Sequence, residues 1–131
     1  MTRHEAREQA FILIFEKSFH EDAIINDLIA FAVENDVFKA DDYSVSLCIN
    51  TIENIETIDA KITENLKGWS YSRVSKVAKA ILRMAVCEML YSEDVPVGAA
   101  INEAVDLAKI YASEDEPSFI NGVLGSVAKG I

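Results

Sequence analysis

The first feature with chemical potential is a basic group near the N-terminus. Arg3 and Arg7 are four positions apart and so share one face of a predicted helix, with His4 beside them. Arginine binds phosphate through paired N–H groups and stacks on bases, so this group is a candidate RNA contact. Glu5 and Glu8 are interleaved with it. A solvent-exposed face with local counter-charges is therefore the competing interpretation.

A second basic group lies further along the chain, on a predicted long helix. At about 100° per residue, its four cations fall within roughly a 120° arc of that helix. They are Arg73, Lys76, Lys79 and Arg83. Four cations on one stripe suit a polyanion or an acidic protein surface. The alternative is a solvated face beside the chain's own acidic helices, and a structural role is the alternative for Arg83.

One acidic side chain falls on an apolar face of the same predicted helix. Glu88 lies among Val77, Ile81 and Met84 at helical spacing. A buried carboxylate is costly unless donors satisfy it, so we expect backbone or hydroxyl groups to bond it and to fix two helices together. Partner binding is the alternative role.

Polar and aromatic positions near the C-terminus give a further candidate. Phe119 and Asn121 lie at the start of the last predicted helix, where the Phe119 ring could pack into the core. Asn102 is predicted to form an inter-helix hydrogen bond. Gly122 is predicted to allow a neighbouring helix to approach closely.

No enzyme or metal motif accompanies these groups. The sequence has no Walker loop, GxGxxG, GxSxG or HExxH pattern, and His4 and His20 have no partner at metal-ligand spacing. The acids at 114–116 precede a predicted helix, where they stabilise its dipole. Cys48 and Cys87 lie in apolar surroundings and are predicted to be reduced core cysteines. We therefore predict a protein that is not an enzyme and needs no cofactor.

Helical periodicity accounts for nearly the whole chain, and no strand alternation, repeat or linker interrupts it. Helices are predicted over about 2–18, 22–34, 41–52, 58–66, 70–91, 96–111 and from 117 onward. Thr2 and Glu5 form a predicted capping box, and Ser70 or Ser72 is the predicted start of the fifth helix. The inward residues of the second helix are predicted to be Ile24, Ile25, Leu28, Phe31 and Ala32. The predicted fold class is all-α, a compact bundle of about seven helices forming one domain over residues 1–131.

The charge distribution constrains the partners. The formal net charge of −10 opposes bulk attraction to nucleic acid, because phosphate binding depends on lysine and arginine. Residues 66–92 nevertheless hold five basic and one acidic side chain, whereas residues 21–65 hold two basic and eleven acidic. No apolar run approaches the roughly 18 residues of a membrane span, and no signal peptide is recognisable, so we expect a cytoplasmic protein.

Several short blocks resemble one family along almost the whole chain. They are Ile81-Leu82-Arg83-Met84-Ala85, Glu88, Asp94-Val95-Pro96, the run from Ile101 to Lys109, Phe119-Ile120-Asn121-Gly122-Val123-Leu124, and upstream Trp69, Arg73, Arg3, Ala6-Arg7 and Ala10. Together these blocks are similar to the NusB family of transcription antitermination factors. The INEAV-LAK and F-NGVL blocks are specific in combination.

The resemblance implies a NusB-like fold and an adaptor function. Such a protein pairs with a small-subunit ribosomal protein, NusE, and the pair binds boxA RNA in ribosomal RNA operon transcripts, which keeps the transcription elongation complex moving. In the family the opening segment is arginine-rich and binds RNA; this chain keeps two arginines there and adds acids. The family also places the start of the last helix near the RNA, which implies that Phe119 could stack on a base. The expected RNA-binding residues are Arg3, His4, Arg7, Arg73, Lys76, Lys79, Phe119 and Asn121. The alternative is a helical protein–protein interaction module of NusB-like fold that has lost RNA recognition.

Overall fold

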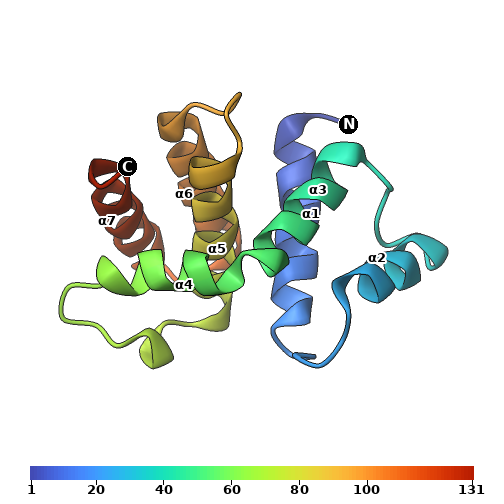
Figure 1. Cartoon of the computed structure of the whole chain (residues 1–131), viewed down its shortest axis with the longest axis horizontal. Coiled ribbons are helices and arrows are strands. Elements are labelled where there is room, and N and C mark those ends of the chain that lie inside the picture. The colour runs from blue at the N-terminus through green and yellow to red at the C-terminus, as the bar shows by residue number, and fades with distance from the viewer.

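A computed structural model describes residues 1–131 as seven α-helices and one 3₁₀ turn, without any strand (Figure 1). The helices are α1 (Arg3–Lys17), α2 (Ile25–Glu34), α3 (Asp42–Glu53), α4 (Ile55–Glu64), α5 (Lys76–Tyr91), α6 (Val97–Tyr111) and α7 (Glu116–Lys129), and the 3₁₀ turn η1 is Tyr71–Arg73. The predicted all-α class with seven helices is confirmed. None of these helices combines the length and apolar character needed to cross a bilayer.

Side-chain caps fix several of the helix starts. The predicted capping box of α1 is present, since Thr2 Oγ1 accepts from Glu5 N–H at 3.1 Å while Glu5 Oε1 accepts from Thr2 N–H at 3.0 Å. Asp41 caps α3 and Ser75 caps α5, each accepting from the backbone N–H three residues further on at 3.1 Å.

The fifth helix starts later than the sequence indicated. Ser70 and Ser72 bond each other through their hydroxyls at 2.8 Å and cap nothing, and Ser75 opens α5 instead. Val74, between the turn and the helix, has an extended backbone. Arg73 therefore belongs to the 3₁₀ turn, and the prediction that it lies on the long helix is wrong.

The second and fourth helices also differ from the predicted bounds. Residues 20–23 form a turn in which Ala23 N–H donates to the His20 carbonyl, so α2 begins at Ile25 and not near residue 22. The fourth helix begins at Ile55, directly after a break at Asn54, and ends before Gly68, whose φ of 78° suits a glycine.

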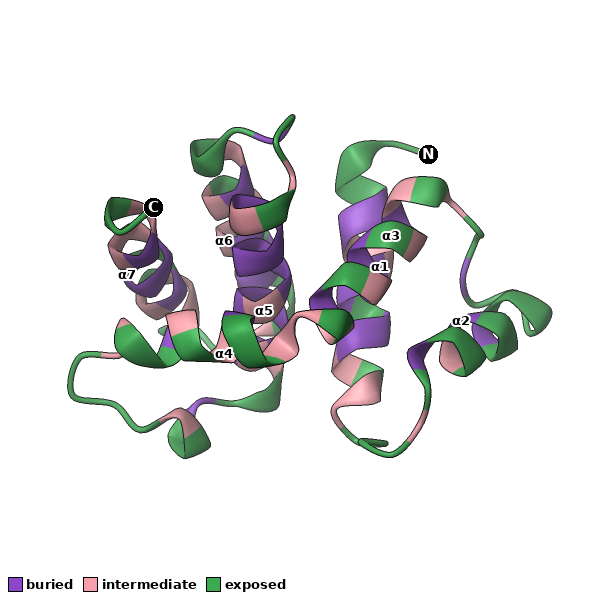
Figure 2. Cartoon of the chain, viewed as in Figure 1, coloured by how far each residue is buried: buried purple, intermediate pink, exposed green.

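The core is built around α5. Ten of its sixteen residues are buried, and it packs against α1, α3, α4, α6 and α7. Figure 2 shows this helix as the most continuously buried element, with mostly exposed residues on α2 and on the outer face of α4. The predicted inward positions of α2 are only partly correct, because Ile24 and Phe31 are 62% and 67% exposed. α2 contacts only α1 and α3 closely.

Candidate nucleic-acid interface

The sequence-predicted RNA-binding residues do not form one surface. Arg3, His4 and Arg7 lie in the first two turns of α1, near the N-terminus at the top of Figure 1. Arg73 lies in η1, at the bottom of the same view, where α5 and α7 begin. The structure therefore separates the predicted site into two ends of the molecule.

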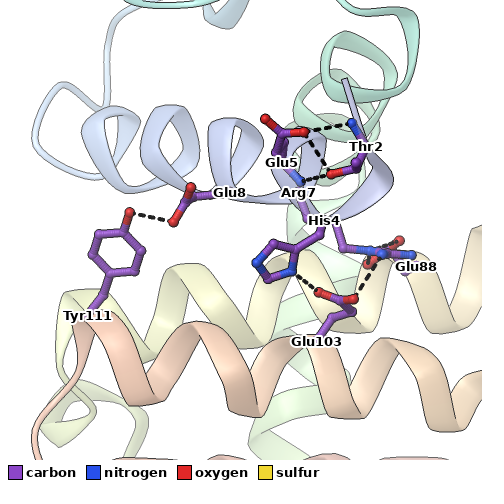
Figure 3. Close-up of polar contacts among 8 residues, drawn as sticks. All are labelled: Thr2, His4, Glu5, Arg7, Glu8, Glu88, Glu103 and Tyr111. Carbon is purple, nitrogen blue, oxygen red and sulfur yellow. Dashed lines mark hydrogen bonds and ion pairs between the residues drawn. The ribbon is translucent and has the colours of Figure 1, made fainter.

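At the N-terminal end, Arg7 is engaged inside the protein. Its Nε donates to both carboxylate oxygens of Glu88 at 2.9 Å, and its Nη1 lies 3.7 Å from Glu103 Oε1 (Figure 3). The Arg7 and Glu88 side chains are 7% and 1% exposed. The Tyr43 hydroxyl also donates to Glu88. A guanidinium that is buried and already paired is not free to neutralise an RNA phosphate in this conformation.

The same network confirms the expectation that Glu88 is buried, is hydrogen-bonded and joins helices. One donor is a hydroxyl, as expected, and it belongs to Tyr43 on α3. The other donor is the guanidinium of Arg7, which was predicted to contact RNA. Burial acts to lower the pKa of Arg7, but the Glu88 carboxylate outweighs it and raises the pKa overall. Burial first, and then the hydrogen bond to Glu88, raises the pKa of Tyr43 to about 12. Both donors therefore keep their protons throughout the physiological range.

Arg3 and His4 are exposed, but their charges are locally balanced. The Arg3 guanidinium lies 3.8 Å from the centroid of the Tyr43 ring and 3.8 Å from Asp94 Oδ2. His4 Nδ1 lies 2.7 Å from Glu103 Oε2, as Figure 3 shows. The hydrogen bond to Glu103 and the charge of that carboxylate raise the pKa of His4. These two residues stay accessible, with a smaller net positive charge than their side chains suggest.

At the other end, two aromatic rings lie together at the surface, Trp69 exposed and Phe119 half-buried. The rings of Trp69 and Phe119 lie 5.4 Å apart between centroids at an interplanar angle of 57°, and Trp69 is 56% exposed. A hollow of about 280 Å³ on one side of the pair includes Arg73, and a hollow of about 310 Å³ on the other side includes Lys67. We call these four residues the Trp69–Phe119 surface. Aromatic faces flanked by cations can stack bases and bind the adjoining phosphates.

A carboxylate fixes the wall of the first hollow. Glu116 accepts hydrogen bonds from Ser75 Oγ at 2.6 Å and from Ser113 N–H at 3.0 Å. Burial acts to raise the pKa of Glu116, but the hydrogen bonds from Ser75 and Ser113 lower it overall, so this side chain stays ionised. The contact joins the starts of α5 and α7 and thereby holds Phe119 in place.

The predicted four-cation stripe is wrong for two of its members. Arg73 is outside α5, and Arg83 donates through Nε and Nη2 to the two carboxylate oxygens of Asp59, at 2.8 and 2.9 Å, in its alternative structural role. Lys76 and Lys79 remain on the first turn of α5. Lys76 Nζ donates to the Ser18 carbonyl at 3.2 Å. Lys79 Nζ lies 4.8 Å from the Tyr71 ring centroid.

The remaining polar predictions concern α6 and α7. Asn102 is exposed, so its predicted role as a buried inter-helix link is wrong. Asn121 is exposed on α7, two residues after Phe119. No atom lies within 4 Å of a Cβ placed on Gly122, so the predicted close helix approach is also wrong. Gly122 instead lines the hollow that contains Lys67.

Sequence reasoning missed two members of the Trp69–Phe119 surface. Trp69 is the only tryptophan and stands between Gly68 and Ser70, in a segment that joins two helices. A large aromatic residue flanked by turn-forming residues is a recognisable signal of an exposed ring. Lys67 carries no such signal, because only the fold brings it beside Trp69 and Phe119.

The structure defines a class of all-helical protein in which an aromatic pair lies at the surface between two cations, Lys67 and Arg73, an arrangement chemically suited to nucleic acid. Comparison of this sequence with known protein families identifies the family. The sequence profile of the NusB family matches residues 4–129. The chain belongs to the NusB family.

Named relatives agree over nearly full length. The transcription antitermination protein NusB of Exiguobacterium sp. is 41% identical over 129 residues, which cover 98% of each chain. The NusB protein of Acetivibrio thermocellus is 43% identical over 134 residues, covering 98% of this chain and 90% of the relative.

Solved structures show the same fold. NusB of T. maritima superposes with a TM-score of 0.85 at 28% identity, covering 98% of this chain and 92% of that one. A structure of the antitermination factors NusB and NusE in complex with double-stranded RNA includes a chain that matches with a TM-score of 0.86 at 29% identity, covering 100% of both.

Proposed function

We propose that this chain is a transcription antitermination factor that pairs with the small-subunit ribosomal protein NusE and binds boxA RNA in ribosomal RNA operon transcripts. The pair would keep the transcription elongation complex moving through those operons. The observation that carries the proposal is family membership over residues 4–129. A similar structure containing NusB, NusE and RNA supports both partners. The proposed role involves no chemical step and no cofactor, and the protein would act in the cytoplasm.

Within this function, we assign the main RNA contact to the Trp69–Phe119 surface and its neighbours. The rings of Trp69 and Phe119 would stack on bases, while Lys67 and Arg73 bind the adjoining phosphates. Five other predicted residues stay in the proposal as further contacts. Lys76, Lys79 and Asn121 lie near this surface, and Arg3 and His4 lie exposed at the far end of the molecule. Arg7 is assigned a positioning role, because its guanidinium is bound to Glu88.

The partner has an electrostatic role in this proposal. RNA affinity depends on the number of phosphates neutralised, with a salt slope of about 0.7 for each on a single strand. The few available cations lie on a chain with a net charge of −10, which repels RNA at long range. A basic ribosomal protein docked on the acidic surface offsets that field and adds cations. The pair should therefore bind RNA more tightly than the single chain, with a steeper salt dependence.

One observation favours the second candidate, an interaction module without RNA recognition. The N-terminal cations are already paired within the chain, since the buried Arg7 is bound to Glu88 and the exposed Arg3 and His4 lie beside Asp94 and Glu103. In that case the chain would bind its protein partner but would not itself bind RNA. Its acidic surface is compatible with both functions.

Filter binding of labelled boxA RNA and of a scrambled RNA of equal composition separates the two functions. Each RNA is titrated with the chain alone, with NusE alone and with the pair, across a salt series. We expect the pair to prefer boxA and to exceed both single proteins in affinity. Equal affinity with and without NusE would refute the cooperative mechanism. Equal binding of both RNAs by the pair would favour the interaction module.

A further inference from the structure

An apolar groove that none of the RNA-binding residues uses lies between α1 and α2. It has a volume of about 490 Å³, and seven of its nine lining residues are hydrophobic. Ile12 of α1, Phe31 of α2 and Val37 in the following segment are 41%, 67% and 69% exposed. Contiguous apolar side chains that remain this exposed mark a surface that another protein covers.

The sequence of α2 explains why the groove is open. Seven of its ten residues are apolar, yet only Ile25, Ile29 and Ala32 are buried, against α1 and α3. Ile24, Leu28 and Phe31 are spaced four and three positions apart and form a second apolar stripe on a different side of the helix. A helix of one domain normally needs a single apolar face for its own core. The second stripe is therefore available to a partner, and it includes groove residues Leu28 and Phe31.

The segment 16–37, which supplies seven of the nine lining residues, is strongly acidic, and we take its carboxylates as the acidic edges of the groove. Residues 16–37 contain six carboxylates and one lysine: Glu16, Glu21, Asp22, Asp27, Glu34, Asp36 and Lys17. Lys17 Nζ donates to the His20 carbonyl at 3.4 Å and so caps the local turn. A second copy of this chain would bring two acidic edges together, and RNA would be repelled. Complementary charge selects a basic protein.

We propose that this groove is the docking site for an apolar segment of a basic protein partner, whose flanking lysines and arginines pair with the acidic edges. The proposal rests on the proposed function, in which the partner is the ribosomal protein NusE, and it assigns that partner a position. His20 lines the groove, and nearby Lys76 lies against the Ser18 carbonyl and 5.1 Å from the Phe19 ring centroid. Cations of the docked partner would therefore lie near Lys76.

The apolar part of the proposal is tested by calorimetric titration of the full chain with purified NusE. Phe31→Ser and Val37→Ser each remove an exposed apolar side chain, and we expect either to weaken binding by about tenfold or more. Ile110→Ser is the matched control, because Ile110 is 60% exposed on α6, away from the groove. It should leave affinity within about twofold of wild type. Helical circular dichroism and melting curves verify that each variant is folded.

The electrostatic part uses charge reversal at the groove edges. Asp27→Lys combined with Glu34→Lys should slow association and flatten its salt dependence, because these carboxylates steer a basic partner. Glu93→Lys combined with Glu114→Lys makes the same change of charge at exposed positions outside the groove. This control variant should associate with NusE faster than the Asp27→Lys, Glu34→Lys variant does.

Three outcomes would overturn the proposal, and each has a distinct meaning. Wild-type affinity for NusE in the Phe31→Ser and Val37→Ser variants would show that the partner binds elsewhere, with the proposed pairing intact. A dimer of the chain that sedimentation equilibrium detects and Phe31→Ser abolishes would assign the groove to a second copy. If wild-type chain does not bind NusE at all, the pairing in the proposed function fails together with the groove.

Discussion

Arg7 and Glu88 are 81 positions apart in the sequence and are joined by one guanidinium N–H that donates to both carboxylate oxygens at 2.9 Å. The contact connects α1 to α5, and the Tyr43 hydroxyl brings α3 to the same carboxylate. Because both charged side chains are almost completely buried, each depends on the other for the interactions that water would otherwise provide.

Removing either member of this pair should therefore destabilise the fold strongly. Arg7→Ala and Glu88→Ala should each lower the free energy of unfolding by about 3–5 kcal/mol, since the remaining charge stays buried without its partner. The double variant Arg7→Met with Glu88→Leu should lose less than the sum of the single losses. Urea unfolding measures all of these, with Arg3→Met as an exposed control. Strict additivity would show that the two side chains act independently.

The aromatic pair should contribute to RNA affinity beyond charge. We expect Trp69→Ala or Phe119→Ala to weaken binding of boxA RNA by the NusE pair by about 1–3 kcal/mol for each base that loses its stacking partner. Tyr91→Ala is the control, because Tyr91 is an exposed aromatic residue, 43% accessible, outside this surface. Unchanged affinity in both aromatic variants, with normal melting, would remove the Trp69–Phe119 surface from the RNA site.

The cations beside the rings should appear in the salt dependence. Lys67→Gln and Arg73→Gln should each reduce the slope of log affinity against log salt by about 0.7, the value for one phosphate contact on a single strand. Lys109→Gln alters an exposed lysine on α6 and should leave the slope unchanged. If Lys67→Gln and Arg73→Gln keep the wild-type slope, as Lys109→Gln should, the phosphates bind elsewhere.

The contact between His4 and Glu103 should make stability depend on pH. Because the folded-state pKa of His4 is raised, its contribution is fully present below the unfolded value of about 6.5 and is lost as pH rises through the folded pKa. The melting temperature of wild type should therefore exceed that of His4→Ala by more at about pH 5.5 than at about pH 8.5. Glu103→Gln should reduce this difference, and a constant gap between wild type and His4→Ala would contradict the assignment.

Local sequence signals identified the helices better than the exact starts of those helices. The capping box at Thr2 and Glu5 is decisive within four residues, so α1 began where expected. Three serines precede α5 within six residues, and all are possible caps. Ser75 is selected by the fold, in which its hydroxyl also donates to Glu116 on α7.

The candidate site was less predictable, because it depends on partners distant in sequence. Arg7 lies three and four positions before Ala10 and Phe11, both buried, and this spacing indicated a core position. Grouping Arg7 with Arg3 by charge concealed that signal. Asn102 shows the opposite case, since a polar residue beside apolar neighbours proved to be exposed. Whether such a polar residue is buried depends on the partner that the facing helix offers, as Glu88 does for Arg7.

The position of Trp69 has a practical consequence. It is the single tryptophan of the chain, it is more than half exposed, and its ring packs on Phe119. Its intrinsic emission therefore reports on one place in the molecule without any attached dye. A base stacked on this ring would change the emission and shield the indole from a dissolved quencher such as acrylamide. The protein thus contains its own optical reporter at the surface where we expect RNA to bind.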